Sequence, residues 1–289
     1  MGFGSFHPFI NFIYFFVTII FVFCVNHPIY VLISYVGGFA FYSILKGKKG
    51  LVFNLVLIPF VILYVMIYAS YNHFGVTVLW QNSIGNNMTK EAIVYGGVLG
   101  IKGVTLIILF ACVLEVMSID KVVYLLGRIS PKLSLYVSIL FRSVPLIGER
   151  EREVSLGRQG IGRGKSDGNI LRRVKNILSV ASIVTTATLD SYIDSSTSMK
   201  ARGYSLKGRT AFSTYRFDNR DRLVLLVMTA LIMITVVAAG LGYTKVLYDP
   251  EIIIENLGWL DVLFVLAYGG LFFLPTGLHT YLDKMYAQS

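Results

Sequence analysis

The sequence predicts an all-α, polytopic membrane protein with about six transmembrane helices and additional long cytoplasmic helices. Three observations support this fold class. The chain of 289 residues is 55% hydrophobic, with a mean hydropathy of +0.68, which exceeds the apolar share of soluble domains. The apolar residues gather in runs about as long as a bilayer-spanning helix. The net charge of +10 comes entirely from one middle segment.

Six apolar runs are candidate transmembrane helices: 9–25, 29–45, 51–69, 97–117, 223–243 and 259–280. The fourth run has Lys102 near its start and Glu115 near its end, and the sixth has Asp261 at its edge. No basic segment precedes the first run and a second run follows closely, so we interpret it as a transmembrane helix rather than a signal peptide. Cys24 and Cys112 lie in apolar runs without metal-ligand spacing, which favours a packing role.

The distribution of charge predicts the orientation in the membrane. Residues 128–222 hold 18 of the 26 Lys and Arg but only 8 of the 16 acidic residues. The positive-inside rule therefore places this segment in the cytoplasm. The basic stretch 46–50 belongs on the same side, whereas the loops 70–96 and 244–256 are expected to be external. Both termini are then cytoplasmic, in a multi-pass protein of the cell (plasma) membrane.

We expect three parts: transmembrane helices in 1–117, a cytoplasmic region in 118–221, and further transmembrane helices in 222–289. The cytoplasmic region is predicted to contain a short element at 118–127 and two long helices, 131–156 and 169–201.

The two long helices have recognisable ends. Pro131 follows Ser130 at the first helical position of one, and Asp167 or Asn169 caps the other. Both helices run into glycine-containing basic turns, "GRQGIGRG" and "ARGYSLKGRT". Glycine is the usual residue just past a helix, and cations there suit the helix dipole. A capped helix end is therefore a sufficient local explanation of both turns.

The stretch "GRQGIGRGKSDGN" (157–169) contains Gly-Lys-Ser but does not fit a nucleotide-binding loop. A Walker A loop needs glycine where this chain has Gln159, and a strand before it, where a charged helix is predicted. We therefore expect no bound ATP. Interspersed acids such as Glu149 and Glu151 argue against nucleic-acid binding. The four histidines share no helical face at metal-ligand spacing, so we predict no metal site, no cofactor and no enzymatic activity.

A protein partner fits the basic turns better. Arg158 and Arg202 are 44 residues apart, each near the exposed end of its own helix. A guanidinium presented in this way pairs with carboxylates in a bidentate fork, so it can fill an acidic groove on another protein.

These residues resemble a known family. The stretch "MKARGYSLKGRT" (199–210) resembles the second Ala-Arg-Gly signature of the transmembrane T component of energy-coupling factor (ECF) transporters, with Ala201, Arg202 and Gly203 as the matching residues. The stretch 126–154 resembles the helix that leads into the first signature. In place of the first Ala-Arg-Gly this chain has Gly157, Arg158 and Gln159. We align Arg158 with the signature arginine, and Arg163 is the alternative.

The resemblance implies a non-catalytic coupling subunit of an ABC-type transporter for a vitamin or a metal ion. Its partners would be two cytoplasmic ATPases, which bind the ATP, a small membrane S component, which binds the substrate, and the lipid bilayer. The long helices would couple the ATPases to the S component, which would pack on the apolar face of 131–147. The alternatives are a self-contained secondary transporter, which needs a polar or broken-helix site at the bilayer midplane, and a membrane scaffold for another cytoplasmic complex.

Overall fold

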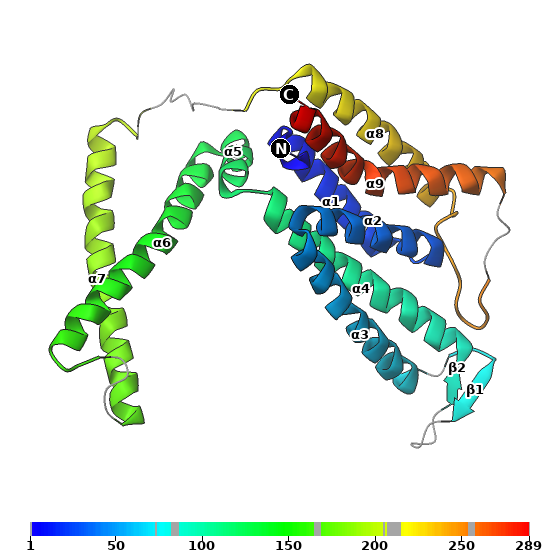
Figure 1. Cartoon of the computed structure of the whole chain (residues 1–289), viewed down its shortest axis with the longest axis horizontal. Helices are drawn as coiled ribbons and strands as arrows, with labels where there is room; N and C mark the ends of the chain where they lie inside the picture. Colours follow the sequence, from blue (N-terminus) through cyan, green and yellow to red (C-terminus); the bar gives the residue numbers. More distant parts are fainter. Residues whose placement is uncertain are drawn as a thin grey trace. The chain divides into compact units, whose positions relative to one another are not determined.

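The computed structural model describes residues 2–72, 74–81, 87–164, 169–204, 206, 215–253 and 258–288 (Figure 1). Helices dominate these residues, which confirms the all-α fold class. The helices are α1 (Pro8–Cys24), α2 (Pro28–Lys46), α3 (Lys48–Tyr71), α4 (Lys90–Val116), α5 (Ile119–Ile129), α6 (Pro131–Gly160), α7 (Ile170–Ala201), α8 (Asn219–Gly240) and α9 (Trp259–Gln288), with a short 3-10 helix η1 (Phe3–Ser5) before α1.

Five of the described helices, α2, α3, α4, α8 and α9, are long and apolar enough to cross a membrane. Helix α1 is equally apolar but has 17 residues. At 1.5 Å per residue it extends about 26 Å, slightly less than a hydrocarbon core of about 30 Å. The chain is therefore a multi-pass membrane protein, with α1 at the lower limit of a spanning helix.

Helix α4 begins earlier than the sequence predicted. It starts at Lys90 rather than near residue 97, because the Thr89 hydroxyl caps it by accepting a hydrogen bond from the Ala92 N–H (3.3 Å). Before it, β1 (Val78–Gln81) and β2 (Asn87–Thr89) pair in an antiparallel hairpin. The predicted loop 70–96 therefore contains regular structure. The earlier start also places Lys102 near the middle of α4 rather than near its beginning.

The chain forms two compact units. One combines residues 1–118 and 215–289, and the other is residues 119–214. We call the first the membrane unit and the second the helical insertion. Residues 118–221 were expected to form the cytoplasmic part, and the two divisions differ mainly at the second boundary.

Helices α2 and α9 pack closely in the membrane unit. A Cβ atom on Gly37 would lie 2.8 Å from the Phe272 Cβ, so only glycine permits this approach. One helical turn away, the Ser34 hydroxyl and the Tyr268 hydroxyl share a buried hydrogen bond of 2.6 Å. Helix α2 is continuous through this region. Gly37 therefore serves the packing of α2 against α9.

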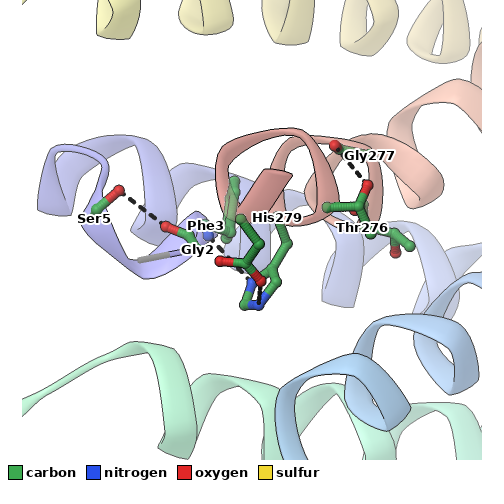
Figure 2. Close-up of polar contacts among 8 residues, drawn as sticks. Gly2, Phe3, Ser5, Thr276, Gly277 and His279 are labelled. Carbon is green, nitrogen blue, oxygen red and sulfur yellow. Dashed lines mark hydrogen bonds and ion pairs between the residues drawn. The ribbon is translucent and has the colours of Figure 1, made fainter. Parts of the chain in front are cut away.

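The short helix η1 packs against α9, and its first residue, Phe3, is buried (Figure 2). The Phe3 N–H donates to His279 Nδ1 of α9 (3.4 Å), and His279 Nε2 lies 3.2 Å from an Asp283 oxygen. The Phe3 ring is fully buried and packs edge-on against Tyr14 of α1 and Phe41 of α2. The N-terminal segment is therefore part of the core of the membrane unit.

Candidate functional site

Helices α6 and α7 run in opposite directions as a bonded pair (Figure 1). Arg150 Nη1 donates to the Ala187 carbonyl and Asn176 Nδ2 donates to the Gly164 carbonyl, both at 2.9 Å. Near these bonds, α7 buries a stripe of residues four apart, Val180, Val184 and Thr188. Polar bonds and an apolar crossing therefore hold the two helices together.

The α7 tip, which we define as residues 201–204, has a glycine-capped end. Gly203 has a φ of 79°, its N–H bonds the Lys200 carbonyl (3.0 Å), and the Tyr204 N–H bonds the Met199 carbonyl (3.2 Å). This pair of bonds is the Schellman motif. Ala201 is the last helical residue, and Arg202 follows it with an exposed side chain. The cap thus presents Arg202 to the surroundings on a fixed backbone.

The α6 tip, residues 157–164, has the same cap. Gly162 has a φ of 68°, its N–H bonds the Gln159 carbonyl (3.0 Å), and the Arg163 N–H bonds the Arg158 carbonyl (2.9 Å). If the two caps are superimposed, Gly162 matches Gly203 and Ile161 matches Arg202. Arg158, which the sequence alignment treats as the counterpart of Arg202, therefore occupies a different position in its cap.

Arg158 also differs from Arg202 in its surroundings. It is half-buried, and its Nη1 donates to the Ser179 hydroxyl of α7 at 2.9 Å. Its Nε is buried and has no hydrogen-bond partner among the described residues. Arg163, the alternative signature arginine, is exposed. In the described part of the insertion, Arg158 thus ties α6 to α7, while Arg163 is the cation that the α6 tip presents.

Gly157 and Gln159 complete the predicted first signature. Both are exposed in the last turn of α6, and a Cβ atom on Gly157 would meet nothing within 4 Å. Their exposure leaves room for a partner around this tip. Lys165 and Ser166, which gave the loop its nucleotide-binding appearance, lie outside the described residues, as do Asp167 and residues 207–210.

The two tips lie at opposite ends of the helix pair. Ser179 is opposite Arg158, and Arg202 follows 23 residues later along α7. At 1.5 Å per residue the tips are about 35 Å apart, on the scale of a small domain. The α6–α7 pair thus has a basic, glycine-capped tip at each of its two ends.

The first half of α6 carries an exposed apolar face. Its members recur at helical spacing and are between 39% and 69% exposed: Leu133, Tyr136, Leu140, Val144 and Ile147. No described residue of the insertion covers them. A contiguous apolar surface of this kind marks a site for protein or membrane contact.

One polar residue of the membrane unit was not expected as a site. Lys102, 9% exposed, donates from Nζ to Asn26 Oδ1 in the α1–α2 turn (2.7 Å), and its Nζ lies 5.6 Å from the centre of the Phe23 ring. The sequence signal was present, since a lysine within an apolar run is unusual. Its partner was hidden because Asn26 is 76 residues away.

No model of a known protein family matches this chain, and a search of curated proteins gave no significant match. Within the described residues, no group of three His, Cys, Asp or Glu side chains has an arrangement that would hold a metal ion.

Proposed function

We propose that this chain is the membrane coupling subunit of an ECF-type transporter for a micronutrient, a vitamin or a metal ion. The observation that carries the proposal is the hydrogen-bonded α6–α7 pair with a glycine-capped, basic tip at each end. In this proposal each tip enters an acidic groove on one of two cytoplasmic ATPases. The exposed apolar face of α6 contacts a small substrate-binding membrane subunit.

The geometry suggests how such a subunit transmits motion. When the ATPases close on ATP, the grooves that hold the tips approach each other. The tips are fixed on their helices by the Schellman caps, and the helices are fixed to each other by bonds such as Arg158 to Ser179 (2.9 Å). A displacement at a tip therefore moves the whole pair, including the apolar face of α6. The chain itself needs no catalytic residue for this role.

The proposal assigns different roles to three arginines. Arg202 and Arg163 contact the ATPases, and Arg158 holds the helix pair together. An arginine buried at an interface as a hot spot contributes about 2 kcal/mol or more, or about thirtyfold in affinity. We therefore expect Arg202→Ala and Arg163→Ala each to weaken ATPase binding by at least that factor.

The test is co-purification of the ATPases with the tagged chain from its native membrane, together with substrate uptake by cells. Arg152→Ala is the matched control, because Arg152 is an exposed arginine of α6 away from both tips. Normal ATPase retention and uptake in Arg202→Ala would contradict the proposal. Transport by the purified chain alone in vesicles would instead support a secondary transporter, and retention of unrelated cytoplasmic proteins without transport would support a scaffold.

A further inference from the structure

Two grooves of the membrane unit meet at the α1–α2 turn. The first, which we call the chain groove, has a volume of about 470 Å³ and lies between α1 and α8. Its apolar lining includes Ile20, Phe21, Val25, Val236 and Ala239. The second, the aromatic groove, has a volume of about 370 Å³ and is lined by Phe74, Tyr95, Tyr248 and Asp249. Asn26, Val246 and Leu247 line both grooves, so the two are adjacent.

The grooves follow each other along the direction in which α4 crosses the membrane. The hydrogen bond between Lys102 and Asn26 places the α1–α2 turn beside the middle of α4 along the axis of that helix. Tyr95 lies seven residues before Lys102, about 10 Å farther toward the start of α4. The aromatic groove therefore lies beyond the turn. The chain groove extends the other way, along the apolar bodies of α1 and α8. An amphiphile in both grooves would have its apolar part in the membrane.

The polar groups at the junction suit a phosphate. Lysine can only donate, so its bond to Asn26 fixes the amide oxygen toward Lys102 and leaves the NH₂ group of Asn26 as a donor. No described residue accepts from that group. Lys245 is exposed and lines the chain groove. Its acidic neighbour in an adjoining pocket, Asp261, accepts from the Gly258 N–H (2.8 Å). Lys245 and Asn26 both line the chain groove, so an ammonium and an amide NH₂ belong to residues of the same groove.

The aromatic groove suits a cation. The Tyr95 and Tyr248 ring centres are 4.9 Å apart, and those of Phe74 and Tyr95 are 5.8 Å apart. The Tyr248 hydroxyl donates to the Asn26 carbonyl (2.7 Å), which holds its ring in place. Asp249 adds an exposed carboxylate beside these rings. Aromatic faces with a nearby carboxylate attract ammonium groups.

We propose that the two grooves bind one zwitterionic phospholipid whose headgroup ends in an ammonium, such as phosphatidylethanolamine. An acyl chain occupies the chain groove, the phosphate contacts Asn26 and Lys245, and the ammonium contacts Tyr95 and Asp249. Phosphatidylglycerol has the same phosphate but ends in a neutral glycerol, so it offers no cation to Asp249 and the aromatic rings. The site is therefore selective for the zwitterionic headgroup. This inference does not depend on the proposed coupling function.

The chain contains a natural reporter for this site. Cys24 is exposed and lines the chain groove, whereas Cys112 is buried. Bound lipid should shield Cys24 from a maleimide. The experiment measures the rate of maleimide labelling of the purified full chain in detergent while phosphatidylethanolamine or phosphatidylglycerol with identical acyl chains is added. A Cys24→Ser variant shows that the labelling occurs at Cys24.

We expect phosphatidylethanolamine to protect Cys24 at a mole fraction about three- to tenfold lower than phosphatidylglycerol, the range for one cation–π contact with one exposed ion pair. Asp249→Asn should remove most of this preference, and Lys245→Gln should weaken protection by both lipids. Glu251→Gln, which removes an exposed carboxylate that lines neither groove, should behave as wild type. Equal protection by the two lipids, protection by neither, or an unchanged preference in Asp249→Asn would overturn the proposal.

Discussion

The contact between Lys102 and Asn26 offers a quantitative test of how the membrane unit is held together. Lys102 is 9% exposed, and its Nζ lies 2.7 Å from Asn26 Oδ1 and 5.6 Å from the centre of the Phe23 ring. The substitution Asn26→Ala removes the first of these contacts. The ammonium then stays buried with the ring as its remaining neighbour in the described structure, so the variant should be destabilised.

The size of the effect follows from measured side-chain hydrogen bonds in membranes. These contribute about 0.6 kcal/mol on average, and a charged partner about doubles a hydrogen bond, so we expect a coupling energy of about 1–2 kcal/mol. Asn26→Ala should cost about 2–3 kcal/mol, because it also strands a buried donor. Lys102→Met should cost about 1 kcal/mol or less. Asn26 is half-buried and lines open grooves, so a water molecule can donate to its side-chain oxygen in place of the lysine.

The assay is a double-mutant cycle by unfolding in mixed detergent micelles, with the two single variants, the double variant and wild type. The double variant should be about 1 kcal/mol less stable than Lys102→Met alone, which corresponds to the expected coupling of about 1–2 kcal/mol. The matched control is the cycle for Lys46 and Glu115, whose side chains are 41% and 33% exposed in an ion pair of 2.6 Å. That coupling should stay below about 1 kcal/mol. Additive single effects at Asn26 and Lys102 would refute the reasoning.

Three further predictions concern glycines and one histidine. Gly37→Ala should destabilise the membrane unit by about 1–3 kcal/mol in the same unfolding assay, whereas at Gly38, where a Cβ atom would lie 3.5 Å from its nearest neighbour, alanine should be neutral or stabilising. Gly203→Ala places a Cβ on a backbone with a φ of 79° and should destabilise the end of α7 by about 1–2 kcal/mol. Amide hydrogen exchange in the last turn of α7 should then be faster. The control is Gly157→Ala, which replaces a helical glycine and should slow exchange in α6. Burial lowers the pKa of His27, so the folded state disfavours the protonated form of this side chain. The free energy of unfolding should therefore fall as the pH drops below about 6.5, the ordinary histidine value. His27→Gln should remove this pH dependence.

The starts of both long helices and the end of α7 could be predicted from the sequence because their signals are local, whereas α6 was expected to end at residue 156 and continues to Gly160. Pro131 after Ser130 marks the start of α6, and Asn169 caps α7, with its side-chain oxygen accepting from the Ile170 N–H (2.8 Å). The expected helix 169–201 is observed as Ile170–Ala201. Proline geometry, side-chain caps and glycine turns act within a few residues, so a single sequence contains the information.

The surroundings of the predicted site residues could not be obtained in this way. Arg158 and Arg202 each precede a glycine-rich turn, so they looked alike in the sequence. They differ because Ser179, on the other helix, accepts a hydrogen bond from Arg158, whereas Arg202 lies beyond the last turn of α7. Asn26 and Lys102 are a similar case, with partners 76 residues apart. Contacts between distant segments depend on how helices pack, which local patterns do not encode.

The burial of Phe3 against His279 has a consequence for biogenesis. Helix α9 is synthesised after α1 and α2, so the Phe3 N–H has no His279 to donate to until α9 has been made. The same holds for Ser34 on α2, whose hydroxyl must wait for Tyr268 on α9. Early helices therefore enter the bilayer with polar groups and aromatic rings still facing lipid. A ribosome that stalls within α9 would release a chain whose first helices are inserted but lack their contacts with α9. Membrane proteases can recognise such a form.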